Sequence, residues 1–235
     1  MRWLSGGRRL ALASAVLLVA APLGTRLGIW TFLVGFALLA LSALSALVGV
    51  LLSVVGGVRT WRWRGTALGI AVGTIVLAVM ASQVVRAGGA PPIHDITTDT
   101  VDPPAFVAAL ELRRDAANPP EYAGADVALQ QQRAFPEIQP LTLGEPPDRA
   151  FGRALAAAQE MGWDVVASAL TEGRIEAVDT TFWFGFKDDI VIRVRAADGG
   201  SRVDVRSKSR VGVGDAGTNA RRVRGYLAAI QRTSG

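Results

Sequence analysis

The chain's single histidine, His94, is followed directly by Asp95, and two more aspartates, Asp99 and Asp102, come a few residues later. A histidine beside a carboxylate is a pair that general-base catalysis or cation binding can use. No second set of ligands is identifiable in the sequence, so His94 and Asp95 form only a candidate polar site. A small envelope hydrolase that uses His94, or an Asp and Arg pair, stays open as an alternative.

Cysteine is absent from the sequence. Thiol nucleophiles and cysteine metal ligands are therefore excluded, and one histidine is too few for a zinc site built on histidines. We expect no metal, no cofactor and no catalytic residue that the sequence can assign.

A glycine-rich motif at residues 212–217, GVGDAG, lies between a predicted strand and a predicted helix. Its spacing matches dinucleotide-binding loops, but such a fold also needs a following parallel strand and an acidic residue about 20 positions further on. The sequence provides neither, so we interpret the motif as a turn. Exposed amides at the helix start, near Arg210, Arg221 and Arg222, leave weak anion binding as an alternative.

Charged and apolar side chains alternate along two predicted strands, residues 190–196 and 202–208, which flank the turn Asp198-Gly199-Gly200. We expect one face to point into a core. The other face carries Arg193, Arg195, Arg202, Asp204, Arg206 and Lys208. Cross-strand charge pairing on a solvated face, with Glu176 from the neighbouring hairpin, explains this pattern. Binding of lipid phosphates or of an acidic partner is the alternative.

Four aromatic residues occur within residues 182–186, FWFGF. We interpret this segment as a buried loop or strand end. A tip that dips into the membrane or docks a partner is the alternative, because aromatic side chains favour such interfaces.

The elements that must position these residues divide sharply by composition. The chain has 235 residues and a formal net charge of +5, yet residues 1–86 contain eight arginines and no acidic residue. The remainder holds 17 basic and 20 acidic residues. Because the basic excess borders apolar runs, it indicates membrane flanks, and we expect no nucleic-acid partner.

The apolar runs predict three transmembrane helices, at about residues 10–25, 30–55 and 65–85, in a membrane domain of residues 1–88. A break in composition, Gly88-Gly89-Ala-Pro-Pro, leads into a second domain of residues 89–235. The first apolar run could instead be a cleaved signal peptide, which would leave the orientation of the later spans unchanged.

The arginines between the spans predict the orientation. Six of them fall on one side and only two on the other: Arg2, Arg8, Arg9, Arg59, Arg62 and Arg64 against Arg26 and Arg86. We therefore expect the N-terminus in the cytoplasm and residues 89–235 outside it, as a periplasmic domain of a bacterial inner-membrane protein.

A strip of glycines, Gly65, Gly69 and Gly73, lines one face of the third predicted helix. Such strips let helices approach closely in membranes. We expect packing against the chain's own second span, with self-association as the alternative.

The second domain is predicted to be a two-layer α+β domain, a four-stranded antiparallel sheet with helices on one face. The strands are two hairpins, residues 163–170 with 174–181 and 190–196 with 202–208. Helices are predicted at residues 105–115, starting at Asp102-Pro-Pro, at 147–162 and at 218–231. Residues 117–143 are expected to be an extended surface segment.

Residues 94–99, 179–189 and 204–222 together resemble the bacterial family called domain of unknown function fourteen-ninety-nine, over about residues 90–232. The resemblance implies no established activity, so no catalytic residue is carried over. It marks these positions as candidate ligand-binding or anion-binding residues: Asp188, Arg206, Ser207, Arg210, Asp215, Asn219 and Arg222. Alternatively, Asp215, Thr218 or Asn219 caps the last helix and the arginines pair with carboxylates.

We therefore expect a non-catalytic inner-membrane protein whose periplasmic domain binds a partner protein, a lipid phosphate or another envelope component. The alternatives are the small hydrolase described above and a helix-packed membrane scaffold.

Overall fold

The computed structural model describes residues 2–61 and 63–232. Two compact units emerge: Met1–Gly88 with Phe182–Gly185, and Gly89–Thr181 with Phe186–Gly235. Arg62, one of the arginines that predict the orientation, lies outside the described residues.

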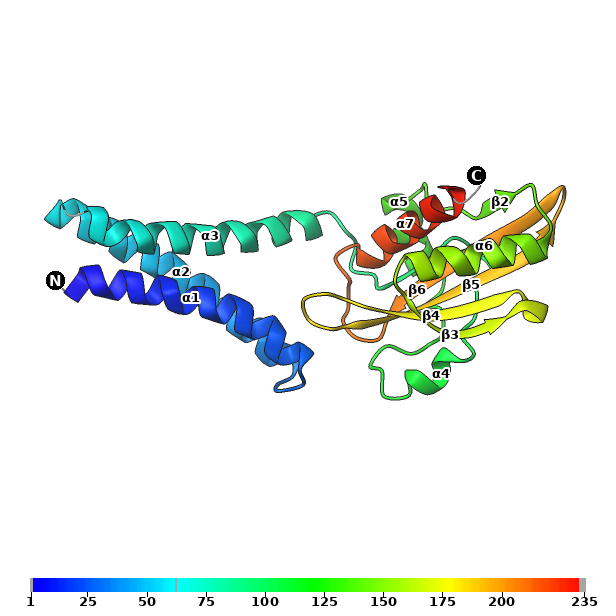
Figure 1. Ribbon diagram of the computed structural model, residues 1–235, viewed down its shortest axis with the longest axis horizontal. Coiled ribbons are helices and arrows are strands. Elements are labelled where there is room, and N and C mark those ends of the chain that lie inside the picture. The colour runs from blue at the N-terminus through cyan, green and yellow to red at the C-terminus, as the bar shows by residue number, and fades with distance from the viewer. Residues whose placement is uncertain (1, 62, 233–235) are drawn as a thin grey trace. The chain divides into compact units, whose positions relative to one another are not determined.

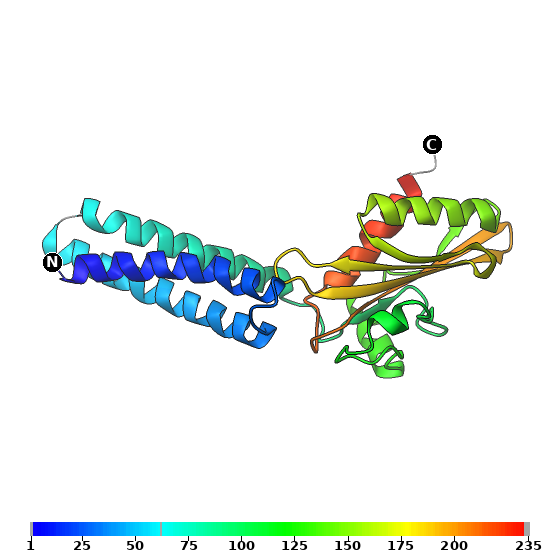
Figure 2. The same ribbon diagram turned by 60° about the horizontal axis from the view of Figure 1, so that its bottom comes forward.

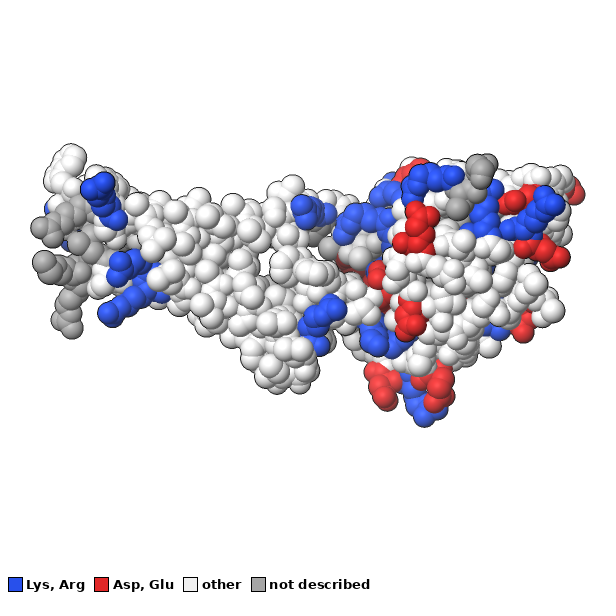
Figure 3. All heavy atoms as spheres, viewed as in Figure 1, with Lys and Arg blue, Asp and Glu red and all other residues white. Residues whose placement is uncertain are grey.

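The first unit contains α1 (Arg2–Arg26), α2 (Phe32–Thr60) and α3 (Trp63–Ala87), shown in blue to cyan in Figure 1. Within the described ranges, three stretches are long and apolar enough to cross a membrane: Ser5–Arg26, Phe32–Thr60 and Trp63–Arg86. The three predicted apolar helices are therefore confirmed. On the face of this unit that Figure 3 shows, the arginine atoms lie near its two ends and the surface between them is uncharged. That distribution suits helices that pass through a hydrocarbon layer.

Small residues let these helices approach closely. The buried positions of α2 are Gly35, Ser42, Ala46, Gly49, Ser53, Gly56 and Gly57. A Cβ atom added to Gly49 would lie 2.8 Å from the backbone nitrogen of Ala11 on α1. The Ser42 hydroxyl donates to the Ser14 carbonyl oxygen at 2.7 Å, a hydrogen bond between α2 and α1. Close backbone contact and such bonds hold helices together where lipid supplies no hydrophobic drive.

The predicted glycine strip on α3 faces these same helices. A Cβ on Gly73 would lie 2.6 Å from Val50 on α2, and one on Gly69 would collide with the Ser53 hydroxyl. Gly65, one turn earlier, has open space at its Cβ position. Two of the three glycines thus pack within the chain, as the first of the two alternatives expects.

The second unit contains an antiparallel sheet with the order β1-β6-β5-β4-β3, and β2 also pairs with β6. Over the described residues, the long strands are β3 (Asp164–Ala169), β4 (Arg174–Thr180), β5 (Lys187–Ala197) and β6 (Gly200–Ser209). These are the four predicted strands. Two short strands, β1 (Asp95–Thr97) and β2 (Leu141–Leu143), extend the sheet along the outer edge of β6.

The hydrophobic core lies between the sheet and two helices, α6 (Pro147–Glu160) and α7 (Thr218–Arg232), which pack side by side on one face (Figure 1). Apolar strand residues such as Ile190, Ile192 and Val205 are fully buried there. Four alanines of α6 are buried against them, so the backbone of the helix comes close to the sheet. The Trp163 ring stacks on Tyr226 of α7, with ring centroids 5.0 Å apart. The α+β prediction is confirmed.

The opposite face of the sheet is covered by residues 98–124, here named the covering segment, which includes the short helix α4 (Ala109–Leu112). Figure 2 shows α4 and α6 on opposite sides of the sheet. The predicted helix 105–115 is thus wrong except for one turn, and it does not begin at Asp102. The prediction of an extended segment at residues 117–143 is also wrong in part, because α5 (Ala125–Ala134) and β2 lie within it.

The aromatic segment forms the β4–β5 connection. Phe182 is 78% exposed and Trp183 is 57% exposed, with their rings edge to face at 5.2 Å. The preferred interpretation, a buried loop, is wrong for these two residues. An exposed aromatic tip is the alternative that the structure supports.

Candidate functional site

Buried charges line the covered face of the sheet. Glu176, Asp189 and Asp204 are fully buried, while Arg206 and Lys208 are 2% and 1% exposed. The prediction of a solvated charged face is therefore wrong. The alternation of charged and apolar residues correctly placed Asp204, Arg206 and Lys208 on one face, but the covering segment removes them from water. Buried charges are costly unless they are paired, so their partners decide what this face can do.

Asp95 of β1 is the centre of one set of partners. Its carboxylate accepts two hydrogen bonds from Arg206, Nε to Oδ1 at 2.9 Å and Nη2 to Oδ2 at 2.8 Å. The Lys208 ammonium donates to Oδ2 at 2.9 Å. The β1–β6 register places Asp95 directly opposite Lys208, so the pairing of the strands brings the groups together.

Asp189 of β5 is the centre of a second, adjoining set. Arg210 donates to it through Nε at 3.1 and 3.0 Å and through Nη2 at 2.6 Å. Arg113, at the end of α4, places Nη1 3.5 Å from the carboxylate, which is an ion pair without a hydrogen bond. Asp189 lies directly opposite Lys208 in the β5–β6 register, so the two sets adjoin.

Two aromatic rings complete this arrangement. The guanidinium carbons of Arg113 and Arg206 lie 5.1 and 4.9 Å from the centre of the Phe106 ring. Arg206 also lies 5.6 Å from the centre of the Tyr122 ring. Ring faces attract cations, and they do so without neutralising them.

We name this group the cationic cluster, with these members: Asp95, Phe106, Arg113, Tyr122, Asp189, Arg206, Lys208 and Arg210. Its four cations face two carboxylates, a formal excess of two positive charges. Burial, together with the charges of Arg206 and Arg210, lowers the pKa of Arg113 against the opposing effect of Asp189 and Asp95. Burial likewise lowers the pKa of Lys208, although Asp95 acts to raise it.

Three polar atoms of the cluster lack a hydrogen-bond partner within the described part of the chain. They are Nε and Nη1 of Arg113 and the hydroxyl oxygen of Tyr122. Burial, followed by the Asp95 carboxylate, raises the pKa of Tyr122 to about 12, so its hydroxyl keeps its proton at neutral pH. Since nearly all buried polar groups in proteins find partners, three orphans in one cluster call for an explanation.

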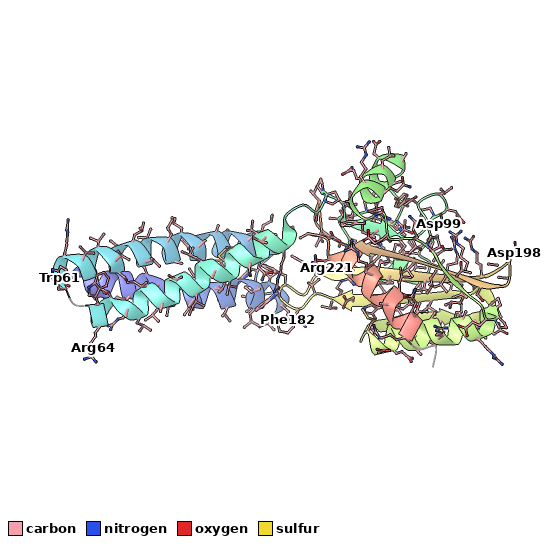
Figure 4. All side chains as sticks on the ribbon, turned by 90° about the horizontal axis from the view of Figure 1, so that it is seen from above. Trp61, Arg64, Asp99, Phe182, Asp198 and Arg221 are labelled. Carbon is pink, nitrogen blue, oxygen red and sulfur yellow. The ribbon has the colours of Figure 1, made fainter. Side chains whose placement is uncertain are left out.

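A second network on the same face is balanced. Asp204 accepts hydrogen bonds from Arg193 at 3.1 Å, Arg195 at 3.0 Å and Arg202 at 2.9 Å. Asp99 of the covering segment, labelled in Figure 4, accepts from Arg202 at 2.7 Å and from Arg193 at 3.3 Å. Asp102 also pairs with Arg193 and Arg195. Three arginines thus meet three aspartates, and this network fastens the covering segment to the sheet.

The α7 side of the sheet unites four of the sequence-predicted site residues. Arg222 donates to Asp188 at 2.6 Å and to the Ser207 hydroxyl at 3.1 Å. The Ser207 hydroxyl donates to Asn219 Oδ1 at 2.6 Å. Burial raises the pKa of Asp188, and the charge of Arg222 opposes that effect. These groups satisfy one another and fix α7 to the sheet.

The other predicted site residues lie apart from those four. Arg206 and Arg210 belong to the cationic cluster on the opposite face. Asp215 caps α7, accepting from the backbone amides of Gly217 at 2.8 Å and Asn219 at 2.6 Å. Those amides are the ones that an anion at the helix start would need, so the capping alternative describes Asp215.

His94 and Asp95 do not act as a pair. The His94 ring Nδ1 bonds to the Val213 carbonyl oxygen at 3.0 Å, while the Asp95 carboxylate faces Arg206 and Lys208. The carbonyl of His94 accepts from the Ser209 amide and from the Asn219 side chain. His94 therefore helps to fix the glycine-rich turn and α7.

Sequence reasoning missed Arg113, Tyr122 and Phe106 as site residues. All three lie in the covering segment, where the predicted helix at residues 105–115 is reduced to the single turn of α4, so no facing direction could be predicted correctly for them. The alternation of charged and apolar residues in β6 indicated Arg206 and Lys208. Asp189 follows the aromatic segment and lies in residues 179–189, one of the stretches that carry the family resemblance. The sequence indicated charged groups on that face but gave no sign that distant residues bury them.

The comparisons with known proteins bear on the second unit. A search of curated proteins and a search of solved structures each found no match. The model of one family, described as a protein of unknown function, DUF1499, matches residues 95–230. That range extends from β1 into α7 and includes every member of the cationic cluster, so more than half of the chain is covered. The chain therefore belongs to the DUF1499 family.

Proposed function

We propose that this chain is a non-catalytic, membrane-anchored binding protein whose α+β unit lies outside the cytoplasm and binds an anionic component of a bacterial envelope. The three apolar helices support the anchoring. The six-to-two division of arginines between the two sides of the spans supports the orientation. An envelope component is then the ligand class that such a unit can reach.

The observation that carries the binding role is the excess of two positive charges in the cationic cluster. A network that served stability alone would gain from balanced charges, as the Asp204 and Asp99 network shows a few residues away. The cationic cluster instead leaves Arg113 without a hydrogen-bonded carboxylate among the residues that the structure describes. An anionic ligand would supply the missing charge.

The contacts of the reactive groups support binding over catalysis. The Ser207 hydroxyl is buried between Asn219 and Arg222, and the His94 ring bonds a backbone carbonyl. Asp95 is fully engaged as an acceptor by two cations. Each of these groups holds the fold in position, and none has the nucleophile-to-base arrangement that hydrolysis requires.

The test is an equilibrium titration of the full chain in nanodiscs of zwitterionic lipid. Inorganic phosphate, citrate and soluble anionic headgroup analogues are added at up to about 10 mM, below the range in which salts stabilise proteins by exclusion. We expect saturable heat of binding for at least one of these anions, which chloride at the same ionic strength does not produce. The proposal is overturned if every anion behaves like chloride.

A matched control removes a cation elsewhere on the same unit. Arg114 is adjacent to Arg113 in sequence, but its side chain is 71% exposed and pairs with Glu111 at the surface. Arg114→Gln lowers the net charge by one, as Arg113→Gln does, and leaves the cationic cluster intact. We expect Arg114→Gln to bind as the unaltered chain does.

A further inference from the structure

We infer that Arg113 and Tyr122 are the ligand-contacting residues of the cationic cluster, and that the ligand group is a phosphate with two negative charges, either inorganic phosphate or a phosphate monoester. This inference rests on the proposed function and names the ligand class and the residues that would bind it.

The hydrogen-bonding capacity of the cluster points to these two residues. Arg206 is already engaged with Asp95 and with the carbonyl oxygens of Pro104 at 3.2 Å and Pro120 at 2.8 Å. Lys208 donates to Asp95 and to the Glu121 carbonyl oxygen at 2.7 Å. These two cations contribute charge, but most of their donors are in use.

Arg113 differs from them. Its guanidinium makes one hydrogen bond within the described residues, from Nη2 to the Asn118 carbonyl oxygen at 3.1 Å. The side chain is 1% exposed, so bulk solvent does not reach the guanidinium. Asp189, the nearest carboxylate, is held instead by Arg210. A buried guanidinium with two unoccupied nitrogens is a strong donor set for an oxyanion.

Tyr122 supplies a second donor beside the same cations. Its ring lies against Arg206, and its hydroxyl is buried without a hydrogen-bond partner in residues 2–61 and 63–232. The residue as a whole is only partly buried, so the cluster reaches the surface at this residue. Arg210, with a side chain 15% exposed, gives a second point at which the cluster meets solvent.

The charge of the cluster selects the ligand class. A carboxylate or a phosphodiester carries one negative charge and would leave one buried positive charge unbalanced. A phosphate monoester in its dianionic form neutralises the excess of two, and its three terminal oxygens are acceptors for guanidinium and hydroxyl donors. A phosphate group also matches a site of two donor residues in size better than an extended polyanion does.

The decisive variant is Tyr122→Phe in the full chain in zwitterionic nanodiscs, titrated with inorganic phosphate. The change deletes only the unpartnered hydroxyl, so we expect the thermal midpoint without phosphate to stay the same or rise, while the phosphate affinity falls about tenfold. Arg113→Gln should lower the affinity further. The matched control is Tyr226→Phe, because that hydroxyl donates to the Ala154 carbonyl oxygen at 2.8 Å. It should lower the midpoint and leave the phosphate affinity unchanged.

The source of the phosphate is distinguished by repeating the titration in discs that contain phosphatidic acid, whose headgroup is a phosphate monoester. A lower apparent affinity for inorganic phosphate assigns the lipid headgroup as the ligand, and an unchanged affinity assigns a free phosphate. Discs that contain phosphatidylglycerol, whose phosphate is a diester, should leave the apparent affinity for inorganic phosphate unchanged.

The outcomes separate this inference from the proposed function. Phosphate binding that is equally tight in the unaltered chain, Tyr122→Phe and Arg113→Gln would overturn the inference and leave anion binding in place. If citrate or phosphatidylglycerol binds and phosphate does not, the inference is likewise overturned and anion binding stays in place. If no anion binds at all, both fail.

Discussion

The carboxylate of Asp95 and the guanidinium of Arg206 meet edge to edge in the interior of the α+β unit, through two hydrogen bonds of 2.9 and 2.8 Å. They come from the first and last strands of the sheet in chain order, and both side chains are at least 97% buried. The pair fixes the short strand β1 against β6 and gives the cationic cluster its centre.

Replacing Asp95 by Ala should be strongly destabilising. Arg206 and Lys208 would lose the carboxylate with which both of them pair, and the excess positive charge of the cluster would rise by one. Removing one partner of a buried ion pair typically costs about 3 to 5 kcal/mol. Chemical denaturation of the unaltered chain and the variant measures the difference. Asp198→Ala, in the exposed β5–β6 turn labelled in Figure 4, is the control and should stay within about 0.5 kcal/mol. A loss below about 1 kcal/mol for Asp95→Ala would contradict the role given to this pair.

Glu176 should act as a remote cap for α4. Its fully buried carboxylate accepts from the backbone amides of Val107, Ala108 and Ala109, the last at 2.8 Å. Glu176→Gln exchanges one acceptor oxygen for a donor that points at those amides, so we expect a loss of about 2 to 3 kcal/mol. The same denaturation experiment on Glu172→Gln, where the side chain is 60% exposed, should show little change. Equal effects of the two changes would rule out the capping role.

Acid should loosen the covering segment through Asp99. Partial burial acts to raise the pKa of this carboxyl, but the Asp102 and Val101 amides and the charges of Arg202 and Arg193 lower it below its ordinary value of 3.8. In the unfolded chain the group therefore takes up its proton first as the pH falls. Its contribution to stability is complete above pH 3.8 and is lost as the pH falls through the folded-state value.

The measurement is the free energy of unfolding between pH 5 and pH 3 for the unaltered chain and for Asp99→Asn. The variant should be less stable at pH 5, and its stability should fall less steeply with acid, because the titrating group is gone. Parallel curves for the two proteins would show that Asp99 does not contribute to the acid sensitivity.

The glycines of α3 should differ in their tolerance of a larger side chain. Gly69→Val places methyl groups against Ser53 and the backbone of Arg8, so we expect overpacking that costs about 1 to 3 kcal/mol. Gly65→Val, one turn away with no heavy atom within 4 Å, should be tolerated. Unfolding by SDS in mixed micelles measures both variants. If Gly65→Val is the more damaging change, the strip packs against a second copy rather than within the chain.

Much of the fold was predictable because its signals are local. The period of two along residues 190–208 and the Asp198-Gly199-Gly200 turn predict the β5–β6 hairpin, and the long uncharged runs predict the membrane helices. The hydrophobic stripe of α7 likewise predicts that Val223 and Ile230 are buried.

The covering segment was not predictable for the opposite reason. Asp102-Pro-Pro has the composition of a helix start, yet the first turn of α4 begins later, where Glu176 from a strand far along the chain accepts its amides. The alternation of charged and apolar residues in β6 shows which side chains share a face of the sheet. It does not show which distant segment covers the charged face. Arg113 and Tyr122 lie in that segment, so the most distinctive residues of the candidate site left no local signal.

The location of the α+β unit outside the cytoplasm is the premise on which an envelope ligand depends, and site-specific labelling tests it directly. The sequence has no cysteine, so a single introduced cysteine is the only thiol. Asp198→Cys lies in an exposed turn of the α+β unit, and Thr60→Cys lies at the exposed end of α2. Intact spheroplasts are treated with a membrane-impermeant maleimide. We predict that position 198 is labelled in intact spheroplasts and position 60 only after lysis. Labelling of position 60 but not of position 198 in intact spheroplasts would place the α+β unit in the cytoplasm and contradict the proposal.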